Sequence, residues 1–157
     1  TPNCSSAASD VYKRQNTDFT FVWSTVETEV DKTSGLVGGA RIGQLESLLP
    51  ESRWNLTAVH NTGDYRILAR YNWVDEWIWW DIYSDPVFSE TVDDMFTLDL
   101  EVSRDLGAYT LTLGAQNATD EYPDNPASTL CCGMKYPEGS PLGFNGAFYY
   151  FKVVLDF

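Results

Sequence analysis

The residues that could carry out chemistry are few and stand apart in the chain. His60 is the only histidine among the 157 residues, and no nucleophile-elbow motif accompanies it. Because a general base must lie within hydrogen-bond reach of the group it activates, a lone histidine near a strand end is interpreted as structural. We therefore expect no enzymatic activity.

The three cysteines do not supply the ligand set of a zinc site. Cys4 lies near the N-terminus, and Cys131 and Cys132 are adjacent, without a C-x-x-C pair or a nearby histidine. We expect no metal and no cofactor. Cys131 and Cys132 are placed in a loop, as free thiols, as a local pair, or in a disulfide with a part of the protein outside this chain.

Three tryptophans, Trp77, Trp79 and Trp80, are candidate ligand contacts because flat aromatic faces can stack on sugars. Packing in an interfacial aromatic girdle is the favoured interpretation of the same residues. Acidic residues surround them, but their spacing is not that of an EF-hand loop. They are interpreted as solvated loop acids. They are Asp75, Glu76, Asp81, Asp85, Glu90, Asp93 and Asp94.

Composition excludes several classes of partner. The chain has 23 acidic and 10 basic residues, a formal charge of −13, which argues against nucleic acid because a phosphate backbone requires a basic surface. The aromatic content of 15% indicates a folded chain. No apolar run approaches the roughly 18 residues of a membrane helix, whereas the alternating strands of a membrane barrel leave no such run.

A period of two dominates from Thr17 onward and predicts long β-strands. The first segment changes its apolar face midway, which predicts a bulge. Soluble strands average about five or six residues, but strands of nine to eleven residues are typical of those that cross a bilayer. The six segments are 17–30, 53–61, 64–80, 95–104, 109–119 and 145–157.

The connections between these segments alternate in length. Tight turns are predicted at 61–64 and 105–107, each with a glycine, and long polar connections at 31–52, 81–94 and 120–144. Short turns on one rim and long loops on the other are typical of outer-membrane barrels. We therefore predict an all-β, antiparallel up-and-down meander of about six long strands.

Alternation also assigns faces. Lysine or arginine on the lipid face of such a barrel costs about 2–4 kcal/mol near the midplane, so Lys152 is predicted to point inward. The predicted inward set is Asp99, Glu101, Gln116, Tyr150, Lys152 and Asp156. The predicted outward set is Leu98, Leu100, Leu111, Leu113, Tyr149, Phe151, Val153, Leu155 and Phe157.

Three segments resemble the C-terminal strands of TonB-dependent outer-membrane receptors. PLGFNGAFYYFKVVLDF (141–157) is similar to the closing strand, whose alternating residues Tyr149, Phe151, Val153, Leu155 and Phe157 resemble the signal read by the barrel assembly machinery. LTLGAQNATDEYP (111–123) resembles the penultimate strand with its Asn-to-Asp motif, although Ala118 and Thr119 are smaller than usual. LPESRWNLTAVHNTGDYRILARYNWVDEW (49–77) resembles the preceding hairpin.

The resemblance covers about residues 17–157 and implies the last part of a 22-stranded transmembrane barrel in the outer membrane of a Gram-negative bacterium. Residues 16–157 would form this barrel segment without the plug domain. The tight turns would be periplasmic and the long loops extracellular. Residues 1–15 resemble a translated sequencing-adaptor artefact, and we expect them to be unstructured.

The function implied by the resemblance is active uptake of a scarce ligand: a siderophore, haem, cobalamin or an oligosaccharide. The implied partners are outer-membrane lipid and lipopolysaccharide, the barrel assembly machinery, the small-molecule ligand, and the TonB complex through an N-terminal part that this chain lacks. Two alternatives are a soluble, secreted, carbohydrate-binding β-protein and, with less support, an outer-membrane barrel enzyme.

Overall fold

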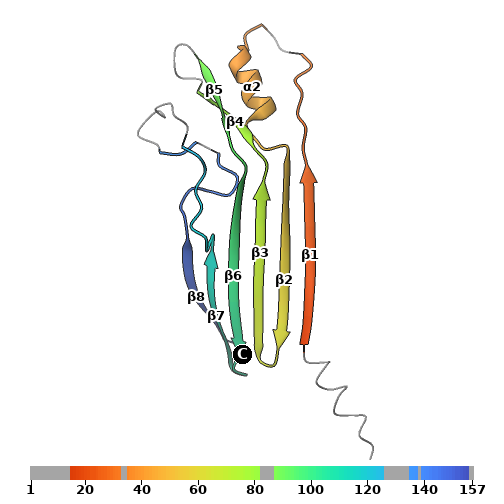
Figure 1. The fold of residues 1–157 in the computed structure, drawn as a ribbon, viewed down its shortest axis with the longest axis vertical. Helices are drawn as coiled ribbons and strands as arrows, with labels where there is room; N and C mark the ends of the chain where they lie inside the picture. Colours follow the sequence, from red (N-terminus) through yellow and green to blue (C-terminus); the bar gives the residue numbers. More distant parts are fainter. Residues whose placement is uncertain (1–14, 33–34, 82–86, 126–134, 138, 156–157) are drawn as a thin grey trace, which may run out of the picture.

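A computed structural model describes residues 15–32, 35–81, 87–125, 135–137 and 139–155. Its main feature is one six-stranded antiparallel sheet in the order β1-β2-β3-β6-β7-β8, in which each strand neighbours the previous strand of the meander (Figure 1). This confirms the predicted all-β antiparallel meander. The strands are β1 Gln15–Thr25, β2 Ser52–Thr62, β3 Tyr65–Val74, β6 Met95–Asp105, β7 Tyr109–Gln116 and β8 Phe148–Leu155.

Two short turns join neighbouring strands at the same end of this sheet (Figure 1). Gly63 and Asp64 connect β2 to β3, and residues 106–108 connect β6 to β7. Gly63 has φ 56° and Gly107 has φ 82°, a conformation that glycine adopts without steric cost. Both predicted tight turns are confirmed, and we call this end of the sheet the short-turn end.

The opposite end, the long-loop end, carries a second small unit that was not predicted. Strand β4 (Trp77–Asp81) pairs with β5 (Phe88–Val92) in a separate two-stranded sheet. The prediction of one strand over 64–80 is wrong because the main sheet ends at Val74. There the chain turns, and Asp75 accepts a hydrogen bond from the backbone N–H of Glu76 through its carboxylate (3.0 Å).

Helix α2 (Gly39–Ser47) lies beside β4, within the segment 31–52 that was predicted to be a long polar connection (Figure 1). The Oγ of Ser47 accepts a hydrogen bond from Nε1 of Trp80 (3.0 Å). A side chain at Gly43 would overlap the Trp80 indole, so glycine is required for this close approach. Among the described residues, no helix has the length and apolar character needed to cross a membrane.

The buried core lies in this unit and where it joins the main sheet. It comprises Val74, Trp77, Trp79, Val92 and Met95, with Leu48 and Leu142 packed against it. These residues fill the space between the ends of β3 and β6 and the β4–β5 hairpin. The long connections therefore include a small folded unit at one end of the sheet.

Strand β1 is regular throughout. It pairs with β2 in one constant register, from Gln15 opposite Thr62 to Thr25 opposite Ser52. The predicted bulge in 17–30 is wrong: β1 ends at Thr25 before the apolar pattern changes face, and the backbone N–H of Val26 donates to the carbonyl of Glu51 (2.8 Å).

Candidate functional site

The strand register sorts the side chains of the main sheet into two chemically different faces. Leu113 lies opposite Phe151, Leu111 opposite Val153, and Leu100 opposite Ala115. The described members of the predicted outward set therefore share one face, as expected, whereas Asp156 and Phe157 lie outside the described residues. The large apolar and aromatic residues of this "apolar face" are Phe19, Phe21, Trp23, Trp54, Leu56, Tyr65, Ile67, Tyr71, Trp73, Phe96, Leu98, Leu100, Val102, Tyr109, Leu111, Leu113, Tyr149, Phe151, Val153 and Leu155.

Most of this face is open to the surroundings. Phe19 is 71% exposed, Tyr149 is 70% exposed and Phe151 is 61% exposed. Helix α2 and the β4–β5 sheet lie beyond the long-loop end and leave the face uncovered (Figure 1). Because soluble monomers rarely expose a contiguous apolar patch of this extent, such a surface indicates contact with a partner or a membrane.

Aromatic rings concentrate at the long-loop end of the apolar face. The Trp54 ring is stacked on Trp73, with centroids 6.0 Å apart, and on Tyr71 at 5.6 Å. Trp23 Nε1 donates to Ser52 Oγ (2.9 Å) and Trp73 Nε1 donates to Asp94 Oδ2 (2.7 Å). Rings with an apolar body and a hydrogen-bonded polar edge suit a membrane–water interface.

The three tryptophans singled out from the sequence lie elsewhere. Trp77 and Trp79 are buried, with 2% and 6% exposure, so they present no free ring face for a ligand. Trp80 packs on α2 over Gly43. The tryptophans at the long-loop end of the apolar face are instead Trp23, Trp54 and Trp73.

The opposite face is polar and is organised around Glu101. Its Oε2 accepts a hydrogen bond from the Tyr150 hydroxyl (2.8 Å), and its Oε1 accepts one from Arg66 Nη1 (3.0 Å). The Tyr150 ring lies directly over Gly114, where a Cβ would overlap it. Sequence reasoning placed Tyr150 and Glu101 on this face but missed the role of Gly114, whose only signal is a glycine inside a strand.

A second group on the polar face joins β3, β6 and the exit of β7. Asp99 accepts hydrogen bonds from Asn72 Nδ2 (3.0 Å) and from the backbone N–H of Asn117 (3.0 Å). Ser103 and Thr112 form a buried hydroxyl pair (2.9 Å). The polar groups of this face thus bond mainly across strands, which fixes the register.

The Asn117–Asp120 motif forms the tight exit of β7. Asn117 and Asp120 both have positive φ, 48° and 59°, a region that Asn and Asp tolerate better than most residues. The carboxylate of Asp120 accepts hydrogen bonds from the backbone N–H of Ala147 (2.8 Å) and from the Tyr122 hydroxyl (3.2 Å). This bond to the carboxylate raises the pKa of Tyr122. The motif ties the exit of β7 to the segment entering β8.

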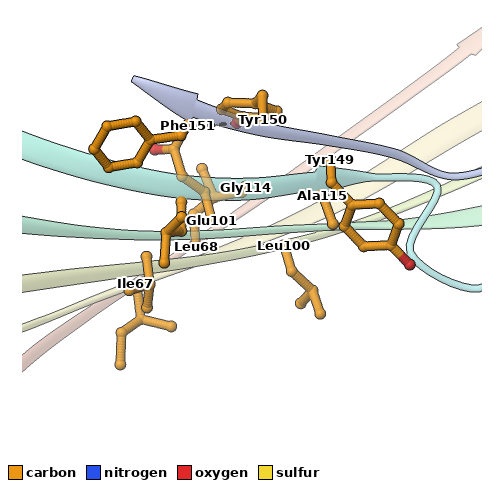
Figure 2. A pocket seen from close by; sticks show the side chains of 11 residues that line it. Ile67, Leu68, Leu100, Glu101, Gly114, Ala115, Tyr149, Tyr150 and Phe151 are labelled. Atoms are coloured by element: carbon orange, nitrogen blue, oxygen red, sulfur yellow. Dashed lines mark hydrogen bonds between the residues drawn. The ribbon is translucent and has the colours of Figure 1, made fainter. Parts of the chain in front are cut away.

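A shallow apolar hollow of about 600 Å³ lies over β3, β6, β7 and β8. Ile67, Leu100 and Tyr149 project on one side of the sheet there, whereas Tyr150 projects on the other (Figure 2). The hollow has no convergent set of polar groups, so it resembles an uneven lipid- or partner-facing surface rather than a site for a polar substrate.

No cluster of three or more metal-ligating side chains occurs in the part of the chain that the structure describes. His60 Nδ1 lies 2.7 Å from Thr17 Oγ1 in a cross-strand hydrogen bond. The candidate functional site is therefore the main sheet itself, with its apolar face on one side and its polar face on the other. Neither a family model, nor a curated protein, nor a solved structure matches this chain.

Proposed function

We propose that this chain is a barrel segment of a TonB-dependent receptor in the outer membrane of a Gram-negative bacterium. The observation that carries the proposal is the apolar face, which runs in register across all six strands with a polar, hydrogen-bonded network behind it. Lipid would contact the apolar face, and the polar face would line the aqueous lumen. Through a longer chain, the receptor would take up a scarce small-molecule ligand with energy from the TonB complex.

The length of the apolar face suits a bilayer. On β3 the face runs from Trp73 at the long-loop end to Tyr65 at the short-turn end, a separation of eight residues. At about 3.4 Å per residue and a tilt of about 40°, this spans roughly 20 Å along the membrane normal, close to the apolar band of about 25 Å in such barrels. Soluble sheets seldom need such length.

The strand edges support the same proposal. In the described residues, β1 and β8 each pair on one side only. Unpaired edges expose backbone donors and acceptors, which a membrane does not tolerate and which a closed barrel removes. We propose that further strands of a longer chain pair with both edges. The alternating side chains of β8 would then carry the signal for the barrel assembly machinery.

The carbohydrate-binding alternative loses its main support. It depended on exposed faces of Trp77, Trp79 and Trp80, and the first two are buried in the core of the long-loop unit. A soluble β-protein would also need a layer to cover the apolar face. The described residues provide none.

A matched pair of substitutions tests the proposal. Leu100 lies in the middle of the apolar face, and Leu68 lies on the polar face opposite Glu101. Leu100→Arg should make insertion of the chain into phosphatidylcholine vesicles less favourable by about 2–4 kcal/mol, as expected for arginine at the bilayer midplane. Leu68→Arg should be close to neutral because its guanidinium lies in the polar network.

Insertion is measured by folding the urea-unfolded chain into vesicles, followed by tryptophan fluorescence and flotation. Both variants replace leucine by arginine, so intrinsic strand propensity and net charge change equally. Equal loss of insertion in both variants, or loss only in Leu68→Arg, would contradict the assignment of faces and the barrel proposal. A folded, monodisperse chain without detergent or lipid would contradict it as well.

A further inference from the structure

One side chain on the apolar face carries a permanent charge in the part of the chain that the structure describes. Arg104 lies in a row with Tyr65 on β3 and Leu111 on β7. It is the second-last residue of β6, at the short-turn end. All other charged residues of the main sheet point to the polar face or lie at strand ends.

The guanidinium of Arg104 has an aromatic contact but no counter-ion. Its Cζ lies 5.2 Å from the centroid of the Tyr65 ring, and no described carboxylate forms an ion pair with it. The other arginines of the main sheet differ: Arg66 pairs with Glu101, Arg70 donates to Thr57 and Arg53 donates to Ser24. The Tyr65 ring therefore holds the Arg104 guanidinium in place, and the N–H groups of the guanidinium have no partner among the described residues.

The position of Arg104 is suited to binding an anion at a membrane–water interface. A guanidinium on a lipid-facing surface is unfavourable at the midplane and nearly neutral at the interface, and its long stem lets the charge reach the polar region. Tyr65 and Tyr109, 42% and 39% exposed, mark the same end of the face and suit a membrane–water interface. A planar guanidinium fits a phosphate with two parallel hydrogen bonds.

We propose that Arg104, held by Tyr65, binds the phosphate of an anionic phospholipid headgroup at the short-turn end of the apolar face. This rests on the proposed function, since it requires that face to contact lipid. Acidic residues crowd the long-loop end, where Asp94 bonds to Trp73. At the short-turn end Asp64 and Asp105 are accompanied by three basic residues, Arg66, Arg104 and Lys152, so the two ends differ in charge. The phosphate contact would therefore also fix the depth and orientation of the sheet.

The test compares partitioning of the full chain into vesicles of phosphatidylcholine and into vesicles of a phosphatidylcholine–phosphatidylglycerol mixture. Because only the anionic vesicles repel the acidic chain, the ratio of the two partition coefficients is compared between variants that carry the same net charge. Arg104→Gln should lower this ratio about fivefold relative to the unsubstituted chain, as expected for one basic residue at the surface of an anionic membrane. Arg104→Lys should recover only part of the ratio, because an ammonium group keeps the charge but cannot form the two parallel hydrogen bonds.

Arg70→Gln is the matched control because it makes the same charge change on the polar face. It should leave the ratio unchanged. If Arg104→Gln and Arg70→Gln give the same ratio while both bind vesicles, the headgroup site is refuted and the proposed function is not. If the unsubstituted chain binds neither type of vesicle, the proposed function fails and the headgroup site fails with it.

Discussion

The contact between Gly114 and Tyr150 gives the sharpest prediction for stability. The Tyr150 ring occupies the space above Gly114 on the polar face, and its hydroxyl donates to Glu101 Oε2 (2.8 Å). In Gly114→Ala the new methyl group overlaps the ring, so the ring must move and the hydrogen bond breaks. The substitution thus removes a cross-strand bond between β8 and β6 that spans β7.

The magnitude follows from two opposing effects. A hydrogen bond to a charged acceptor contributes about 1.5–3 kcal/mol, and the lower end applies because the Glu101 carboxylate keeps its ion pair with Arg66 when this bond is lost. Alanine in a strand is favoured over glycine by roughly 0.5–1 kcal/mol. Gly114→Ala should therefore lower the free energy of unfolding by about 1 kcal/mol.

A double-mutant cycle isolates the mechanism. Tyr150→Phe removes the hydroxyl and should cost about 1.5 kcal/mol. In the Tyr150→Phe background no hydrogen bond is left to break, so Gly114→Ala should be close to neutral, with a coupling energy of about 1 kcal/mol. The assay is urea unfolding of the chain in detergent micelles, followed by tryptophan fluorescence and circular dichroism.

Two results would refute this reasoning. Gly114→Ala could stabilise the chain in the unsubstituted background, which would show that the ring does not occupy the space above position 114. Alternatively, the effects of the two substitutions on the free energy of unfolding could be additive. This would show that Gly114→Ala does not destabilise the chain by breaking the hydrogen bond between Tyr150 and Glu101. Glu101→Gln provides an independent check because it keeps the shape and weakens the acceptor.

Two further predictions concern the long-loop end. Gly43→Ala should displace the Trp80 indole, break its bond to Ser47 and cost about 1–3 kcal/mol by overpacking; a fluorescence change without loss of stability would contradict this. The hydrogen bond to Asp120 raises the pKa of Tyr122. This hydrogen bond therefore stabilises the fold at neutral pH, and the stabilisation is lost as the pH rises through the raised pKa of Tyr122. Asp120→Asn should lower that pKa in an ultraviolet titration, with Tyr122→Phe assigning the signal, and an unchanged pKa would contradict the contact.

The main sheet was predictable because its signals are local. Alternation at Leu98 to Val102 and at Leu111 to Ala115 sets each face, and the glycines at positions 63 and 107 mark the turns. A two-residue side-chain period and a constant register leave few alternatives. The same local signals placed Tyr150 and Glu101 on one face before any contact between them was known.

The long-loop unit was not predictable because its stability is tertiary. Helix α2 begins after Gly38 with no side-chain cap and contains Gly39 and Gly43, so its local helix propensity is low. Its position depends on Trp80, far along the chain. Likewise, the burial of Trp77 and Trp79 requires the β4–β5 hairpin to fold back on the ends of β3 and β6, which alternation alone does not reveal.

The headgroup candidate was missed for a related reason. Arg104 is the last residue of the predicted segment 95–104, and it was assigned to neither face from the sequence. Only the register shows that it shares a row with Tyr65 and Leu111. The absence of an ion pair among described residues then separates Arg104 from Arg66.

The central claim, that the apolar face contacts lipid hydrocarbon, is tested most directly by spin labels on four successive residues of β8. Labels are placed singly at Phe151, Lys152, Val153 and Val154, in a background with all three cysteines replaced by serine, and the chain is reconstituted in phosphatidylcholine vesicles. Labels at 151 and 153 should be more accessible to oxygen, and labels at 152 and 154 more accessible to a water-soluble nickel chelate. Val154 is decisive because it is apolar yet faces the polar side, opposite Thr110. Equal accessibility at all four positions, or oxygen preference at 154 as well as 153, would contradict the account.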